Sequence, residues 1–287
     1  MTVELSFAEY RLVLDPAHGG AIDRFDWNGE PLMRAVCGPT ILDKASFPLV
    51  PFSNRVAHGC LAWQGREIRL APNLPGTDHP HTLHGFGWLA PWQVAAASPT
   101  SARLTLSYPG GEWPWPFQAE QQFTLDSHGL TMALSVQNLG DSAMPAGLGF
   151  HPYFPRTAQT RYLGLHHGEW HNTPDCLPLS LDEHPVARDW WQGQPVDAHA
   201  VDTVYTEREG DLAIWWPERK LRLTLEPSAN LPFTVVYSPP GEPFFCVEPV
   251  SHMTDAFNRA DQGAQFATLA PGEVLRVSVR LSASTIA

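Results

Sequence analysis

A histidine in the middle of the chain stands among residues that would fix its position. His151 lies in the stretch GLGFHPYFP at 147–155, between Phe150 and Pro152. Two preceding glycines let other groups approach the backbone closely, and the proline indicates a rigid turn. An imidazole held in this way suits proton transfer near neutral pH. A histidine satisfied at the end of a buried strand would have the same surroundings, and this segment alone slightly favours that structural interpretation.

A carboxylate with complementary chemistry follows a second apolar segment. Glu248 ends the run FFCV at 244–247 and is followed at once by Pro249. We expect its carboxylate to emerge at the end of a strand, partly removed from water, where burial raises a carboxyl pKa toward that of a useful base. The alternative is a glutamate that caps or braces the turn at 249–255. With Glu248 as a partner, the catalytic interpretation of His151 becomes the favoured one.

Two more polar clusters lie beside glycine, proline or aromatic residues. Arg55 ends the sequence PFSNR at 51–55, where its guanidinium could orient a substrate oxygen or pair with a carboxylate. Taken alone, that segment favours the structural role. The sequence HPHTLHGFGW at 79–88 contains three histidines, which raises the question of a metal site. We discount a metal because a proline separates the first two and no HExxH or cysteine partner accompanies them. Only His84, next to Gly85, is placed for a ligand.

The elements that must carry these residues are predicted to be strands. Apolar and polar residues alternate with a period of two at 103–106, 130–137 and 275–282. Turn sequences separate such runs at 28–29, 64–65, 127–129 and 239–241. The 28 prolines argue against long helices. The prediction is an all-β fold, a large antiparallel β-sandwich in a single domain over 1–287, with 156–200 forming long loops at its rim.

Composition narrows the classes of partner. The net charge of -12 argues against binding to nucleic acid, which needs clustered lysine and arginine. The longest apolar run, LAIWW at 212–216, is too short to span a membrane, and no secretory signal is readable at the N-terminus. Four cysteines form no CxxC pair, so reduced thiols are expected. These observations predict a cytoplasmic enzyme or binding protein that acts without contact with a membrane.

Four motifs together resemble one family. Asn54-Arg55, Leu83-His84-Gly85, the GFHPYF sequence at 149–154 and Glu248-Pro249 occur in the order and spacing of the aldose 1-epimerases, or galactose mutarotases. The resemblance extends from roughly residue 10 to 282. It implies a β-supersandwich and an enzyme that interconverts the α and β anomers of a free sugar.

The resemblance also implies roles for the matched residues. Glu248 would be the base that takes the proton of the anomeric hydroxyl, and His151 the acid that protonates the ring oxygen. His84 and Arg55, with the adjacent Asn54, would bind oxygens around the sugar ring. Asp202, in the sequence VDTVY at 201–205, resembles the sugar-binding aspartate of the family through a weaker match.

The chemistry of a hemiacetal agrees with this division. Ring opening removes one proton from the hydroxyl on C1 while another reaches the ring oxygen, so a base and an acid must face two oxygens of one sugar. Neither a metal nor a nucleotide is required, and no phosphate-cradling glycine loop is present, so no cofactor is expected. The partner is a small-molecule sugar. The chain could act as a monomer or a homodimer.

Three alternatives remain at this point. A hexose-6-phosphate mutarotase would need several basic groups in the cleft, and the acidic composition favours neutral sugars, although Arg66 and Arg69 form a local basic pair. A carbohydrate-binding β-sandwich would not need the acid and base. A glycoside hydrolase would use Glu248 and Asp202 as two carboxylates. The sequence VSHMT at 250–254 departs from the usual family pattern, so the local turn is expected to differ.

Overall fold

The computed structural model describes residues 2–259 and 265–286. Twenty-three strands make up most of it, and the helices within the described residues are short 3-10 turns. The strands are β1 (Val3–Phe7), β2 (Tyr10–Asp15), β3 (Ala21–Trp27), β4 (Glu30–Pro31), β5 (Ser46–Leu49), β6 (Arg55–Val56), β7 (Cys60–Trp63), β8 (Arg66–Arg69), β9 (Thr82–Leu83), β10 (Gln93–Ala97), β11 (Ser101–Tyr108), β12 (Phe117–Asp126), β13 (Gly129–Asn138), β14 (Met144–Ala146), β15 (Gly149–Pro155), β16 (Arg161–Asn172), β17 (Pro178–Asp189), β18 (Val201–Trp216), β19 (Leu221–Pro227), β20 (Phe233–Ser238), β21 (Phe244–Val250), β22 (Ala267–Leu269) and β23 (Val274–Thr285). The 3-10 turns are η1 (Ile41–Asp43), η2 (Ala57–Gly59), η3 (Gly87–Leu89), η4 (Val196–Ala198), η5 (Pro217–Arg219) and η6 (Ala256–Asn258).

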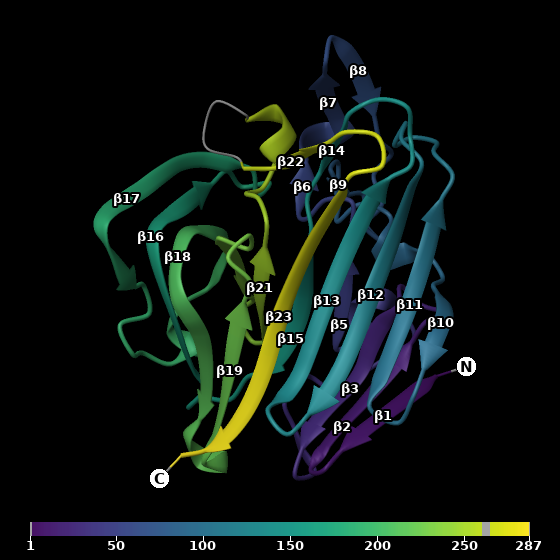
Figure 1. The fold of residues 1–287 in the computed structure, drawn as a ribbon. Coiled ribbons are helices and arrows are strands. Elements are labelled where there is room, and N and C mark those ends of the chain that lie inside the picture. The colour runs from purple at the N-terminus through teal and green to yellow at the C-terminus, as the bar shows by residue number, and fades with distance from the viewer. Residues whose placement is uncertain (1, 260–264, 287) are drawn as a thin grey trace.

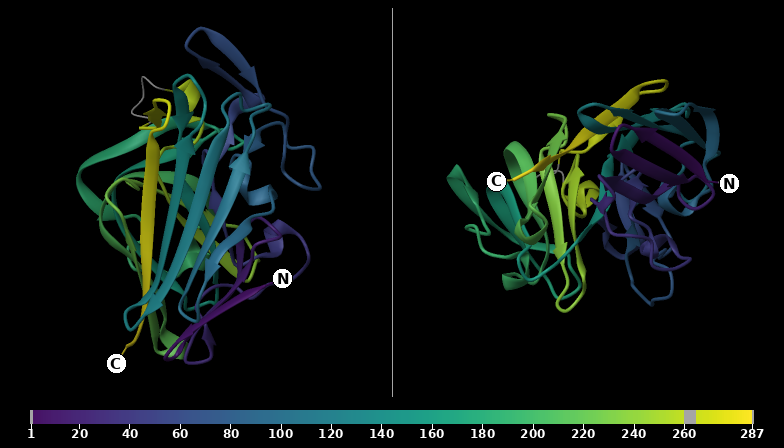
Figure 2. Two further views of the ribbon diagram at one scale, coloured as in Figure 1. Left: turned by 45° about the vertical axis from the view of Figure 1, so that its right-hand side comes forward. Right: turned by 90° about the horizontal axis from the view of Figure 1, so that it is seen from below.

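One large antiparallel sheet of 17 strands holds the molecule together, and it has two branches that meet at β18. One branch runs β10–β11–β12–β13–β23–β19 and pairs with the second half of β18. The other runs β1–β2–β3–β5–β15–β21–β20 and pairs with the first half of β18. Figure 1 shows the first branch passing across the second, and Figure 2 shows the curvature from two further directions. The predicted all-β antiparallel sandwich is therefore confirmed.

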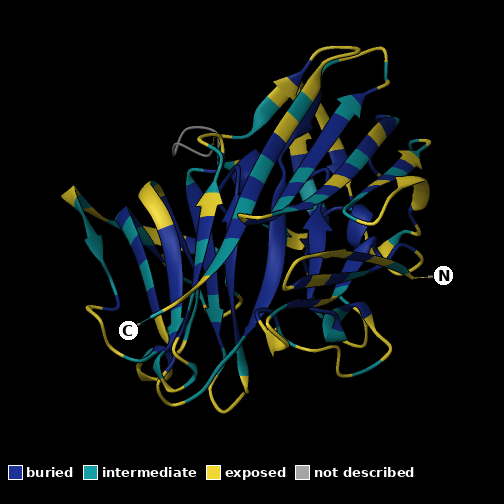
Figure 3. Ribbon diagram, turned by 60° about the horizontal axis from the view of Figure 1, so that its bottom comes forward, coloured by how far each residue is buried: buried dark blue, intermediate teal, exposed yellow. Residues whose placement is uncertain are grey.

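The sequence signals for regular strands correspond to real strands. The alternating segments at 103–106, 130–137 and 275–282 lie in β11, β13 and β23, and all four predicted turns connect consecutive strands. Along β11 and β13 the inward residues are buried and their neighbours are partly exposed, as a pleated strand with one packed face requires. Figure 3 shows buried positions along the central strands, and exposed ones at the loops and in bands along the outer strands.

The prediction of long loops over 156–200 is wrong. Two strands of 12 residues, β16 and β17, occupy most of that segment, and β16 pairs with both β17 and β18. Buried residues do alternate along β16, but glycines and a histidine fill several of the inward positions between Tyr162 and Trp170. Small and polar residues on the packed face hide the alternation that would have revealed the strand.

Two central strands differ from the rest because they are buried along almost their whole length. Every residue of β15 except the last is buried, and every residue of β21 except the first. β15 pairs with β5 on one side and with β21 on the other. A strand covered on both faces can only carry a polar side chain that has a partner or lines a cavity.

No helix in the described part of the chain is long and apolar enough to cross a membrane.

Candidate active site

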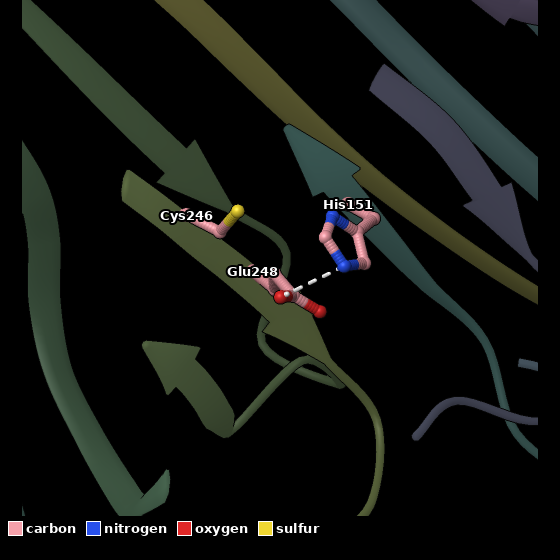
Figure 4. A group of neighbouring side chains, drawn as sticks. All are labelled: His151, Cys246 and Glu248. Atoms are coloured by element: carbon pink, nitrogen blue, oxygen red, sulfur yellow. Dashed lines mark ion pairs between the residues drawn. The ribbon is translucent and has the colours of Figure 1, made fainter. Parts of the chain in front are cut away.

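His151 and Glu248 face each other across the β15–β21 pair. Gly149 is paired with Val250 and Tyr153 with Cys246, and this register places residue 151 opposite residue 248. Nε2 of His151 lies 3.2 Å from Oε1 of Glu248 (Figure 4). The expectation of a rigid turn around His151 is wrong, because the whole GFHPYF sequence is strand. Glu248 likewise lies inside β21 instead of emerging at a sheet end, with only 2% of its surface exposed.

Burial controls the protonation of this pair. It raises the pKa of Glu248 well above its usual value, an effect that Asp202 increases and Arg55 opposes. It lowers the pKa of His151 to about 3, which the histidine's own backbone carbonyl opposes. Oε2 of Glu248 and Nδ1 of His151 have no hydrogen-bond partner among the described residues. Buried polar atoms are usually paired, and these two unpaired atoms belong to residues that line a pocket.

Aromatic rings hold the imidazole of His151 in place. β5 brings Phe47 opposite His151, with ring centroids 4.4 Å apart. Tyr153, two residues along the same strand, stacks at 4.8 Å. The ring of His84 meets that of His151 edge-on at 5.2 Å. These contacts leave the imidazole little freedom to rotate, so its Nε2 edge is directed toward Glu248.

Asn54 and His84 are fixed by each other. The backbone N–H of Asn54 donates to Nδ1 of His84 over 3.1 Å, and both residues have positive φ angles of 54° and 58°. Because burial lowers the pKa of His84 well below its usual value, the ring is neutral. A neutral imidazole that accepts at Nδ1 carries its proton on Nε2. His84 is therefore a hydrogen-bond donor on its free side.

Arg55 pairs with a carboxylate, one of the two roles that its sequence left open, and it also lines the pocket. Its Nη2 atom lies 3.0 Å from Oδ2 of Asp202, a residue of β18, and its Nη1 donates to Oδ1 of Asn54 over 3.0 Å. Pairing of β6 with β9 sets Arg55 opposite Leu83, one residue before His84. Both members of the Arg55–Asp202 ion pair are only partly buried and line the same pocket. The pair thus neutralises its own charge while keeping donors and acceptors available to a ligand.

All six predicted site residues line one pocket of about 290 Å³. A volume of this order is at the small end for ligand sites in proteins. The lining combines polar and ionisable side chains with aliphatic and aromatic ones. The polar residues are Asn54, Arg55, His84, His151, Asp202 and Glu248, and the remaining lining residues are Leu42, Leu74, Leu83, Tyr153, Val235, Tyr237 and Phe244.

A residue that sequence reasoning missed contacts three of the other lining residues. The guanidinium carbon of Arg34 lies 3.8 Å from the ring centroid of Tyr153 and 4.7 Å from that of Phe244. Its Nη2 donates to the backbone carbonyls of Leu42 and Lys44, each over 2.6 Å. Arg34 therefore holds three lining residues of the pocket from behind. In the sequence it stands among ordinary apolar residues and gives no signal of this position.

The segment that departs from the family pattern has a structural task. Nε2 of His252 accepts the backbone N–H of Ser53 over 3.1 Å, and its Nδ1 donates to the carbonyl of Met253 over 2.8 Å. The hydroxyl of Ser251 accepts the backbone N–H of Leu148 over 2.8 Å. These bonds fasten the turn before Asn54 and the approach to β15. The two segments that carry the site are thus tied to the end of β21.

The histidine cluster at 79–84 does not converge on one point. Nδ1 of His79 accepts the backbone N–H of His81, and Nδ1 of His81 accepts that of His58. Within the described residues, the one group of side chains with the geometry to hold a metal consists of His151, Cys246 and Glu248.

Comparison with known proteins gives a consistent result. The model of the family described as "Aldose 1-epimerase" matches residues 1–282. The uncharacterized protein YphB of Escherichia coli K12 is 35% identical over 264 residues, which is 89% of each chain. A crystal structure from the same organism, of a protein described as a candidate aldose 1-epimerase, is 31% identical and covers 100% of this chain and 99% of its own, with a TM-score of 0.90. A galactose 1-epimerase from Lactobacillus acidophilus shares the fold with a TM-score of 0.74 at 14% identity, over 98% of this chain and 93% of its own.

Proposed function

The chain belongs to the aldose 1-epimerase family, and we propose that it interconverts the α and β anomers of a free, uncharged aldohexose. Glu248 acts as the base and His151 as the acid. Asn54, Arg55, His84 and Asp202 bind the hydroxyl and ring oxygens of the sugar.

The contact between His151 and Glu248 carries this proposal. In a cyclic sugar, the ring oxygen and the anomeric hydroxyl oxygen are bonded to the same carbon. An acid and a base that serve these two oxygens must therefore lie side by side and face one small pocket. Nε2 and Oε1, which are 3.2 Å apart, meet that requirement. A structural ion pair would have no reason to line a cavity, and a sugar-binding surface would have no need of the pair.

The His151–Glu248 pair can supply and accept both protons that ring opening requires. In its reactive form it is a carboxylate beside an imidazolium. Ring opening moves the hydroxyl proton of C1 to Glu248 and the Nε2 proton of His151 to the ring oxygen, which leaves a carboxylic acid, a neutral imidazole and an open-chain aldehyde. Burial favours these uncharged forms, as the raised pKa of Glu248 and the lowered pKa of His151 indicate. Burial thus lowers the energy of the uncharged pair relative to the carboxylate–imidazolium pair from which ring opening starts.

Reclosure on the other face of the aldehyde reverses both proton transfers. Between the two steps the aldehyde must turn about the bond from C1 to C2. The polar residues can hold the rest of the sugar during this rotation, with Nε2–H of His84 and the guanidinium of Arg55 donating and Asp202 accepting. Leu42, Leu74, Leu83, Val235 and Phe244 offer no side-chain hydrogen bonds, so they do not hold the aldehyde oxygen as it turns.

The charges in the pocket support a neutral substrate over a phosphorylated one. Arg55 is the one lysine or arginine among the described lining residues, and Asp202 already neutralises it. A phosphate group would therefore meet two carboxylates without a spare cation. Arg66 and Arg69, the basic pair noted in the sequence, lie on β8 outside the lining, and Arg69 contacts Glu67 at 2.6 Å.

Polarimetry of freshly dissolved α-D-glucose and α-D-galactose tests the proposal. The protein should speed the relaxation, and Glu248→Gln should cost at least ~100-fold in rate, the lower end for an acid–base group. Unchanged rates in Glu248→Gln would contradict the assignment. Sugar binding without any rate effect in the wild type would favour a binding module. Release of reducing sugar from an aryl glycoside would favour a glycosidase, and a preference for 6-phosphorylated sugars would reverse the substrate class.

A further inference from the structure

A third side chain, that of Cys246, lies beside the His151–Glu248 pair, and the proposed reaction has no use for it. A ring nitrogen of His151, Sγ of Cys246 and a carboxylate oxygen of Glu248 all lie within 4.8 Å of one another, and all three residues are buried. Cys246 is not among the residues that line the pocket. Figure 4 shows it beside Glu248 on β21, with the ring of His151 approaching from the neighbouring strand.

The arrangement follows from the strand geometry. Cys246 and Glu248 are two residues apart on β21, so their side chains project from the same face. The pairing of Tyr153 with Cys246 brings His151, two residues before Tyr153 on β15, to that same face. Three donors of different type, nitrogen, sulfur and oxygen, are thus held by two hydrogen-bonded strands. Such a frame does not need to fold around an ion in order to present its ligands.

We propose that His151, Cys246 and Glu248 form a binding site for a zinc-like soft divalent cation, and that the bound ion inhibits the enzyme. Zinc takes exactly this set of donors, at about 2.0–2.1 Å from nitrogen, 2.3 Å from sulfur and 2.0–2.2 Å from oxygen. In a tetrahedral site with those bond lengths, neighbouring ligand atoms are about 3.3–3.6 Å apart. The separation of 3.2 Å between Nε2 and Oε1 is already close to this spacing. Only the sulfur has to move closer.

The sulfur decides which ions fit. A thiolate favours zinc and other soft ions, whereas magnesium and calcium prefer sites made of oxygen alone. The fourth position of the tetrahedron would face the pocket, which His151 and Glu248 line, and would be filled by water. On binding, zinc displaces the thiol proton of Cys246 and the carboxyl proton of Glu248 to solvent, so the ion meets two anionic ligands and one neutral ligand.

Inhibition is the expected consequence because the ion occupies the atoms that move protons. Zinc on Nε2 removes the nitrogen that serves the ring oxygen, and zinc on the carboxylate removes the base. Only this inhibitory effect rests on the proposed mutarotase activity. Binding of the ion does not depend on it, so the two can be tested separately.

Cobalt is the probe for binding, because a thiolate bound to Co²⁺ gives a charge-transfer absorption in the near ultraviolet. Wild-type protein titrated with Co²⁺ should develop this band, and Cys246→Ser should lose it. Cys246→Ala, which offers no ligand atom, should give the same result and so exposes any effect peculiar to a buried serine hydroxyl. Cys37→Ser removes an exposed thiol and should keep the band. Glu248→Gln should weaken the binding of cobalt without any need for an activity measurement.

Zinc chloride is the probe for inhibition in the mutarotation assay. The wild-type rate should fall with zinc and return with a chelator, while magnesium at the same concentration leaves it unchanged. The inhibition constant should rise in Cys246→Ser by at least the ~10–100-fold that loss of even an outer-shell partner costs a metal site. Absence of the cobalt band in the wild type, or equal zinc inhibition in the wild type and Cys246→Ser, would overturn the proposal. A band in a protein without mutarotase activity would leave the metal site standing and remove the proposed function.

Discussion

His151 on β15 and His166 on β16 are two buried histidines with the same electrostatic signature and different surroundings. Burial lowers the pKa of each to about 3. Nε2 of His166 lies 2.9 Å from the hydroxyl of Thr234, a neutral partner within the sheet. Nε2 of His151 lies 3.2 Å from the carboxylate of Glu248, in the wall of a pocket. A shifted pKa alone therefore does not separate a functional histidine from a structural one.

The two kinds of site differ in whether their buried polar atoms all have hydrogen-bond partners. His252 resembles His166, since both of its ring nitrogens are hydrogen-bonded to the protein backbone. At the His151 site, Nδ1 of the imidazole and Oε2 of Glu248 have no hydrogen-bond partner among the described residues. Unpaired buried polar atoms destabilise the fold. A site that retains them beside an open space is suited to a ligand, whereas a fully paired histidine stabilises the fold that holds the site.

The same substitution at both positions gives the largest contrast. His151→Asn should lower the rate of mutarotation by at least ~100-fold, because it removes the proposed acid. His166→Asn should lose far less than that, since its ring does not reach the pocket. Both rates would be measured by polarimetry on protein whose folding is verified by circular dichroism. Similar losses in the two variants would mean that His151 acts through the fold, and the comparison would break down.

The residues of the site show which features could be predicted from the sequence and which could not. The motifs around His151 and Glu248 predicted that both belong to one site, and the structure places them together in one pocket. Their state of burial was predicted less well, because a strand covered on both faces looks like any apolar run, and a single sequence does not say which strands pair. Arg34 and His252 could not be identified because their contacts cross between strands and loops that are distant in the chain. β16 was missed because glycine and histidine occupy its inward positions.

For the free energy of unfolding we expect the opposite order: substitution of a structural histidine, His252, should cost more than substitution of His151. His252→Leu leaves the buried N–H of Ser53 and the carbonyl of Met253 without their partner, which should lower the free energy of unfolding by about 1–3 kcal/mol. His151→Leu orphans one buried polar atom, Oε1 of Glu248, and no backbone group, so it should cost less. Urea denaturation of both variants measures the difference. His252→Gln, whose amide can both accept and donate, is the matched control and should recover part of the loss. A greater cost at His151 than at His252 would reverse the assignment of the two sites.

The smallest expected effect is on the pH dependence of stability, which tests the two buried structural histidines, His166 and His252. Burial lowers the pKa of His166 to about 3 and that of His252 to about 4, whereas the unfolded chain takes up a proton near the ordinary value of about 6.5. Below that value the unfolded state binds more protons, so stability is complete above about pH 6.5 and is lost as the pH falls toward the folded values. Between pH 7.5 and 5.5 each residue should contribute a loss of about 1 kcal/mol.

The free energy of unfolding of His166→Asn should therefore fall by about 1 kcal/mol less than that of the wild type over this interval, as measured by urea denaturation at the two pH values. His167, which is half-buried, has a pKa raised by its hydrogen bond to Glu209, so His167→Asn should not reduce the sensitivity to acid. Equal acid sensitivity of His166→Asn and the wild type would show that His166 is not held neutral by the fold.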